Sequence, residues 1–135
     1  MPKKRIHRRF PSSIKIEKSI DFVGLYYDNE GFRVHISDFS KEKSEIFVIN
    51  FGAMVLAHRC MDEGKYLSLE AIADVYDYPD SPIVIVENSD FLEWFHNESL
   101  NLYIKDTIFH VMILTQDDWI DVLCLNLPKI NIIYS

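Results

Sequence analysis

Several absences in the sequence narrow its class before any motif is considered. No run of about 18 uncharged apolar residues occurs, so a transmembrane helix is excluded. Glycine and proline are scarce, at 4 and 5 residues, while 48% of the chain is hydrophobic, which excludes collagen-like and disordered classes. The 2 cysteines lack CxxC spacing, and the basic stretch 1–10 lacks the apolar core of a secretory signal peptide. The sequence therefore predicts a cytoplasmic protein with buried, free thiols.

The length of 135 residues fits one domain, and the formal net charge is −7. Residues 1–18 contain seven Lys or Arg side chains against Glu17, so this stretch is strongly basic and the rest of the chain strongly acidic. We expect 1–18 to form a flexible N-terminal arm and 19–135 to form a single α+β domain.

Short β-rich runs dominate that domain, and polar turns separate them. The expected strands are 21–27, 32–39, 45–51, 83–86, 107–115 and 119–125. The stretch 52–63 is ambiguous between a helix and a bulged strand, and we favour the strand. The apolar end, 130–133, is expected to be tied to the fold. These runs predict a mainly antiparallel sheet of five to seven strands with one or two helices packed on it.

Two segments have helical character. Residues 67–75 have a candidate cap at Ser68, and residues 88–99 have apolar side chains at helical spacing behind a cap at Asn88 or Ser89. The second segment is the stronger helix, because acidic residues also occupy its first turn.

Signatures of catalysis are missing: the chain has no GxSxG, Walker glycine loop, GxGxxG or HExxH motif. The histidines stand singly, without a spacing that prearranges metal ligands; they are His7, His35, His58, His96 and His110. His58 and Cys60 share a strand face but lack an orienting group. The acidic residues Asp117, Asp118 and Asp121 are expected to form a turn and a solvated face. We therefore predict no catalytic residue, metal site or cofactor.

The most unusual feature is the acidic segment from Asp62 to Asp90, in which eight carboxylates face a single cation, Lys65. Tyrosines interrupt these charges, and tyrosine supplies contact area while carboxylates steer a basic partner. The candidate partner-binding residues are Asp74, Tyr76, Asp77, Tyr78 and Asp80. A nucleic-acid partner is not expected, because the acidic body repels a polyanion.

A family resemblance agrees with this interpretation. The residues that carry the resemblance are Phe51, His58-Arg59, Asp62-Glu63-Gly64, Val86 to Phe95, Glu98-Ser99, His110 to Thr115, and Ile120 to Leu123 followed by Pro128. Over roughly residues 20–130, the chain resembles small bacterial proteins associated, in part, with polymorphic-toxin or contact-dependent inhibition loci as immunity proteins. The resemblance implies a cytoplasmic protein that binds and neutralises a toxin domain, often a basic nuclease, through an acidic surface.

The leading hypothesis is thus a non-enzymatic protein that binds a basic partner, such as a toxin domain, and has no membrane partner. One alternative is a small enzyme with His58, Cys60 or His110 in a pocket. The other is a structural subunit of a homo-oligomer, since the sequence leaves the oligomeric state open.

Overall fold

The protein is built from two antiparallel β-sheets and a helix, as a computed structural model describes it for residues 5–12, 14, 16, 20–38, 45–62 and 81–134. The elements are β1 (Ile6–Arg9), β2 (Asp21–Asp28), β3 (Gly31–Ser37), β4 (Glu45–Gly52), β5 (Val55–Asp62), β6 (Ile83–Glu87), α2 (Asp90–Glu98), β7 (Phe109–Leu114), β8 (Asp118–Cys124) and β9 (Lys129–Tyr134). The expected antiparallel α+β character is confirmed. The expectation of one sheet is wrong, because the strands divide between two.

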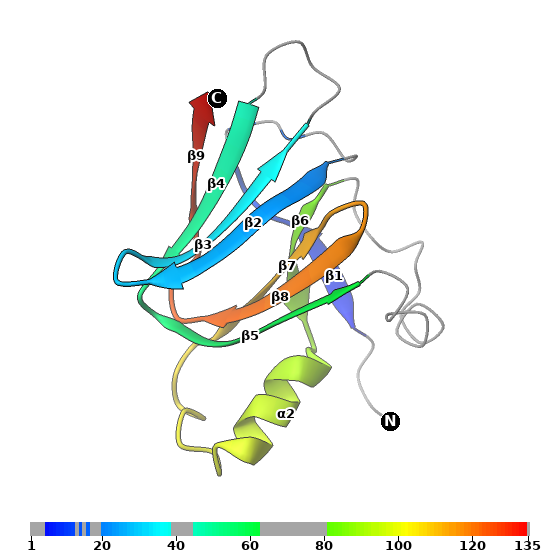
Figure 1. Cartoon of the computed structure of the whole chain (residues 1–135). Coiled ribbons are helices and arrows are strands. Elements are labelled where there is room, and N and C mark those ends of the chain that lie inside the picture. The colour runs from blue at the N-terminus through cyan, green and yellow to red at the C-terminus, as the bar shows by residue number, and fades with distance from the viewer. Residues whose placement is uncertain are drawn as a thin grey trace.

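Sheet A has the strand order β1-β6-β7-β8-β5, and sheet B has the order β2-β3-β4-β9. The two sheets lie face to face, with α2 beyond the β5 edge of sheet A (Figure 1). Apolar side chains from both sheets form one buried cluster between them, including Phe32 and Ile49 of sheet B and Val111 and Ile120 of sheet A. Alternation along each strand places these residues on the inner faces.

The expected hairpin is confirmed as β2 and β3, which pair from Asp21 with Ser37 to Asp28 with Gly31. Gly31 has a φ of 103°, and a Cβ there would lie 2.8 Å from the backbone oxygen of Gly52, so only glycine fits this turn. The Arg33 guanidinium donates a hydrogen bond to Asp28 and holds the pKa of that carboxyl at about 2.

The ambiguous stretch after β4 crosses from one sheet to the other. Gly52 has a φ of 69°, a left-handed conformation that ends β4, and the chain resumes as β5 in sheet A. The expected strand over 52–63 is therefore present as Val55–Asp62, but it is a separate strand and not a bulged extension of the preceding one.

The basic arm contributes a strand. Residues Ile6–Arg9 pair antiparallel with β6, and Phe10, whose amide donates to the Ile83 carbonyl, belongs to the buried cluster. The expectation of a solvated tail is wrong for these residues, because their backbone pairs with β6 although the side chains of Arg8 and Arg9 are exposed.

The other local predictions have mixed outcomes. The strands expected near 83–86, 107–115 and 119–125 and the helix of 88–99 are present, and the apolar end forms β9, which pairs with β4. The helix expected over 67–75 lies outside the described residues. In the part of the chain that is described, no helix is long and apolar enough to cross a membrane.

Candidate functional site

A chain of polar side chains crosses sheet A and ends at the first turn of α2. Arg59 Nε of β5 donates to Asp121 Oδ2 of β8 at 2.8 Å, and Asp121 Oδ1 lies 2.6 Å from His110 Nε2 of β7. His110 Nδ1 lies 2.6 Å from Ser89 Oγ, which caps α2 by accepting the Leu92 amide at 3.0 Å. The strand register explains the order, because Arg59 pairs directly with Asp121 while His110 is diagonal to it.

Burial determines how this network is protonated. The side chains of His110 and Asp121 are both 0% exposed. Burial lowers the pKa of His110, and the hydrogen bond to Asp121 only partly opposes this effect. Although burial alone raises the pKa of Asp121, the hydrogen bond from His110 and the charge of Arg59 hold it below its usual range. The network therefore consists of a neutral imidazole beside a carboxylate that is paired with Arg59.

One tautomer satisfies every polar atom in that state. A neutral His110 that carries its proton on Nε2 donates to Asp121, so Nδ1 accepts the hydroxyl proton of Ser89. The lone pairs of the same hydroxyl accept the Leu92 amide. The network thus connects the start of α2 to three strands of sheet A.

Ser89 lies at a sharp transition from strand to helix. Asn88 has a φ of 56°, which turns the chain after β6, and Ser89 is extended at φ −79° and ψ 122°, as an N-cap requires. The sequence-based expectation of a cap at Asn88 or Ser89 is confirmed for Ser89. Asp90 and Glu93 in the first turn complement the positive end of the helix dipole.

A pocket of about 480 Å³ opens beside Ser89 and His110, between the end of β6, the start of α2 and the segment before β7. Arg8, Leu92 and Phe109 contribute to its walls. The order of Ser89, His110 and Asp121 is that of a serine-histidine-carboxylate triad, in which histidine accepts the serine proton. In this chain the serine oxygen also caps a helix, a use that competes with nucleophilic attack.

A second pocket, of about 310 Å³, lies between β5 and α2. Its lining residues are Ala57, His58, Arg59, Phe91 and Trp94. The Arg59 guanidinium lies 4.3 Å from the Phe91 ring centroid, and Phe91 stacks on Trp94 with centroids 5.7 Å apart. Asp121 therefore orients the same arginine that forms part of this pocket.

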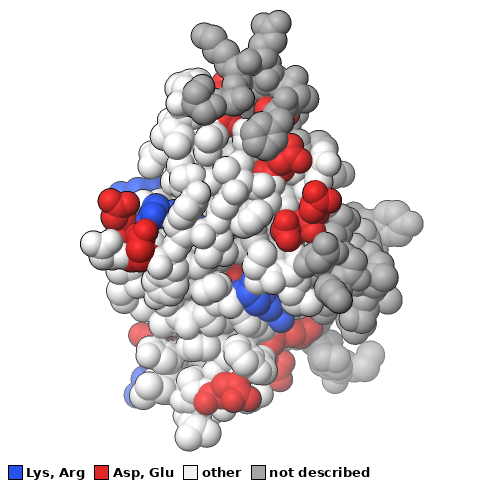
Figure 2. Space-filling view, viewed as in Figure 1, with Lys and Arg blue, Asp and Glu red and all other residues white. Residues whose placement is uncertain are grey.

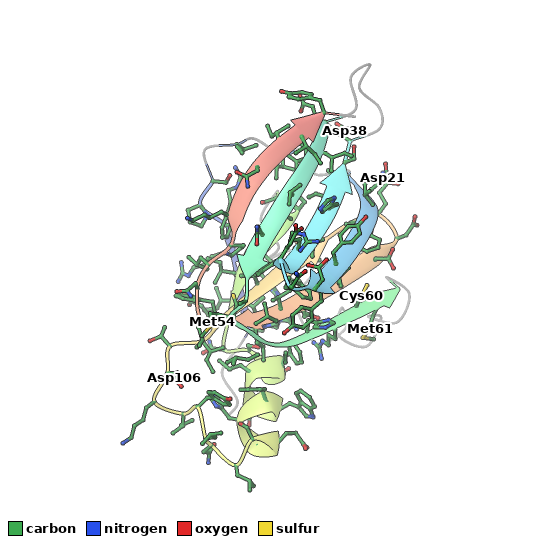
Figure 3. All side chains as sticks on the ribbon, turned by 60° about the vertical axis from the view of Figure 1, so that its left-hand side comes forward. Asp21, Asp38, Met54, Cys60, Met61 and Asp106 are labelled. Carbon is green, nitrogen blue, oxygen red and sulfur yellow. The ribbon has the colours of Figure 1, made fainter. Side chains whose placement is uncertain are left out.

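The helix and the segment after it, residues 89–106, form a unit that we call the α2 lobe. Four of its large apolar side chains are exposed: Trp94 by 51%, Leu100 by 88%, Leu102 by 75% and Ile104 by 56%. Exposed acidic residues lie among them, namely Asp90, Glu93, Glu98 and Asp106, with Lys105 as the lobe's only Lys or Arg. Figure 2 shows acidic side chains on the part of this lobe that faces the viewer. Figure 3 places Asp106 at the same end of the molecule as Met54, which is also exposed.

The expected partner-binding loop, with Asp74, Tyr76, Asp77, Tyr78 and Asp80, lies outside the described residues. Its role stays a prediction.

The expectation of a solvated acidic face at residues 117–121 is wrong for Asp121. Asp117 is exposed, but Asp121 is 0% exposed, because strand alternation turns it onto the face that carries Arg59 and His110. The sequence does contain an indication of this burial, because Asp121 lies inside the apolar run 119–125 and a charge in such a run needs a buried partner.

The cysteine prediction is half right. Cys124 is buried and free, whereas Cys60 is free but exposed on edge strand β5. The partial burial of its thiol and the nearby Asp118 carboxylate raise the pKa of Cys60, which is the opposite of activation. His58 shares its strand face but packs against Phe32, with centroids 4.7 Å apart. Within the described residues, no group of three His, Cys, Asp or Glu side chains is arranged to hold a metal ion.

No protein-family model, curated protein or solved structure matches the chain. The assignment of function therefore rests on the residues of this protein.

Proposed function

We propose that the chain is a non-enzymatic protein-binding domain of the immunity-protein type, which binds a basic partner such as a toxin domain through an acidic surface. The observation that carries this proposal is the α2 lobe, where Trp94, Leu100 and Leu102 are exposed among carboxylates. Large exposed apolar side chains rimmed by polar groups are typical of interaction sites.

The charges of the lobe favour a cationic partner. Within the described residues, Asp90, Glu93, Glu98 and Asp106 form no ion pair, so their full charge is available to a ligand. Elsewhere, Arg8 is paired with Glu87 and Arg33 with Asp28. Unpaired rim charges mainly raise the rate of association, while a buried aromatic or aliphatic anchor supplies most of the affinity.

Leu100 adds a conformational argument. Its φ of 52° is left-handed, a conformation that costs a residue with a Cβ roughly 1–2 kcal/mol. It is also 88% exposed and so gains little from burial within the chain. A bulky residue that is both strained and exposed supports a role in contact with a partner.

The test is a capture experiment from native bacterial lysate at low and high salt. The bait proteins are the wild type, a Glu98→Gln, Asp106→Asn variant of the lobe, and an Asp21→Asn, Asp117→Asn variant with the same charge change elsewhere. The proposal expects one basic protein that binds the wild type and the control at low salt and is lost with the lobe variant. If all three baits retain the same proteins, the proposal is contradicted.

A second candidate function, acyl hydrolysis, is favoured by the consecutive contacts of Ser89, His110 and Asp121 beside an open pocket. In such a reaction Ser89 Oγ bonds to the acyl carbon and its proton passes to His110 Nδ1 and then to the alcohol or amine, which departs as its bond to the acyl carbon breaks. Water then hydrolyses the acyl ester and restores the serine hydroxyl. A fluorophosphonate probe tests it, because labelling that disappears in Ser89→Ala identifies a nucleophilic serine. We place binding first, since the Leu92 amide already occupies the serine oxygen.

A further inference from the structure

We infer that the groove between β5 and α2 binds an extended, cationic segment of the partner, which adds as a strand to β5 and inserts an apolar side chain into the pocket lined by Arg59, Phe91 and Trp94. The inference rests on the proposed function and specifies how the partner would bind.

The first observation is an open strand edge. Among the described strands, β5 pairs only with β8, so no described strand pairs with the backbone groups on its other side, which is the edge to which a strand could be added. The strand runs from Val55 to Asp62, long enough for several residues of a ligand. Figures 1 and 3 both show this edge beside α2, and Figure 3 places Cys60 and Met61 toward the far end of the strand.

The second observation is an aromatic pocket against that same edge. Its volume of about 310 Å³ is bounded by Ala57, His58 and Arg59 on the strand and by Phe91 and Trp94 on the helix. A sheet edge beside a helix is an established way to recognise extended peptides, because the backbone supplies affinity and the pocket supplies side-chain specificity.

Contacts with Asp121 and His110 hold two lining residues of the pocket, Arg59 and Phe91, in place. Asp121 and the Phe91 ring fix the Arg59 guanidinium on two sides, and Phe91 is also in edge contact with His110 at 5.6 Å. A preformed pocket lowers the conformational cost of binding. Because Asp121 forms an ion pair with Arg59 and compensates its charge, the pocket does not require an anionic ligand.

The occupant follows from the charges at the rim. Asp90 and Glu93 are exposed on the first turn of α2, and Asp118 lies close enough to Cys60 to raise the pKa of its thiol. None of these three carboxylates forms an ion pair with a described residue. A segment with lysine or arginine on either side of an aromatic or aliphatic residue complements this arrangement.

The experiment titrates the isotope-labelled chain with the peptide acetyl-Lys-Val-Lys-Phe-Lys-Val-Lys-amide and follows the amide and indole resonances by NMR. Shifts confined to the β5 edge and the Trp94 indole, with slowed amide exchange in β5, support the inference. The same peptide N-methylated at every internal residue, which has no internal N–H left on either edge to donate to β5, should bind at least about tenfold more weakly.

Two matched variants separate the groove from other exposed aromatic surface. Trp94→Ala removes a pocket wall and should weaken the peptide about tenfold or more, whereas Tyr134→Ala removes an exposed aromatic side chain outside the pocket and the α2 lobe and should leave the affinity unchanged. Equal effects of the two variants overturn the inference. Shifts along β2 or β9 also overturn it. So does a dimer of the free chain in light scattering whose formation changes the β5 amide resonances.

The two proposals can fail separately. If the peptide does not bind while the lysate partner is still captured and lost with Glu98→Gln, Asp106→Asn, strand addition is wrong and the protein-binding function stands. If the peptide binds as expected while the three baits capture the same proteins, the groove is a peptide site and the acidic-lobe function is wrong.

Discussion

His110 and Asp121 contact each other across β7 and β8, with 2.6 Å between His110 Nε2 and Asp121 Oδ1, and neither side chain is exposed. They are 11 residues apart in sequence, and the turn between their strands brings them together. Through Ser89 and Arg59 this pair connects the α2 lobe to the edge strand β5. The pair therefore fixes the two walls of the proposed groove relative to each other.

Replacing the carboxylate should destabilise the fold. Asp121→Asn removes the buried carboxylate charge that pairs with Arg59 and places an amide donor against a donor, and we expect a loss of about 3 kcal/mol in the free energy of unfolding. That figure is at the low end for a buried pair because the Arg59 side chain is 33% exposed. Urea denaturation measures it, with Asp117→Asn as an exposed control that changes little. A loss below about 1 kcal/mol for Asp121→Asn would contradict a structural role for the network.

Stability should fall on mild acidification because of His110. Burial holds the pKa of His110 below its ordinary value of 6.5, so the unfolded chain takes up the proton first. Its contribution is complete above about pH 6.5 and is lost as the pH falls toward the folded-state pKa. Denaturation between about pH 7 and pH 5 should show a steeper decline for the wild type than for His110→Gln. Equal slopes for the two proteins would indicate that His110 is not buried in its neutral form.

In the free protein the hydroxyl of Ser89 hydrogen-bonds His110 and also caps α2 at the Leu92 amide, and Ser89→Ala removes both contacts. We expect a loss of about 2 kcal/mol, from the helix cap and from the unsatisfied His110 nitrogen. Ser89→Thr keeps the hydroxyl and should lose much less. Thermal unfolding compares the two variants. If Ser89→Ala is as stable as Ser89→Thr, the hydroxyl does not stabilise the helix cap.

Leu100 should show opposite effects on stability and binding. Asparagine tolerates the left-handed region better than leucine, so Leu100→Asn should stabilise the free chain by about 0.5–1 kcal/mol. The same change removes an exposed apolar contact and should weaken partner binding. Leu102→Asn is the matched control for stability, since no left-handed φ occurs there and the same change should not stabilise the chain. A stabilised variant that binds the captured partner at full affinity would exclude Leu100 from the interface.

Local patterns predicted most strands of the fold and its described helix. β-rich composition between polar turns identified the runs that became β2, β3 and β4, with alternation in β3, and the helical spacing behind Ser89 identified α2. The residues of each such pattern lie within a few positions of each other, so these elements can be predicted from the sequence without knowledge of tertiary contacts.

The arrangement of the strands was not predictable in the same way. Alternation does not state which sheet a strand joins, so Gly52 looked like a bulge instead of a crossing between sheets. Strand β1 was missed because two of its four residues, Arg8 and Arg9, are exposed and charged and the strand is held by backbone pairing. The partners of Asp121 come from other strands, and their meeting depends on register, which a single sequence does not specify.

The salt dependence of partner binding measures how far the carboxylates of the α2 lobe contribute to the complex. With the captured partner purified, the Kd of the wild type should rise steeply with salt, and Glu98→Gln, Asp106→Asn should both weaken binding and flatten this slope. The control Asp21→Asn, Asp117→Asn should follow the wild type. An affinity that is independent of salt, or that the lobe variant leaves unchanged, would contradict binding through the acidic α2 lobe.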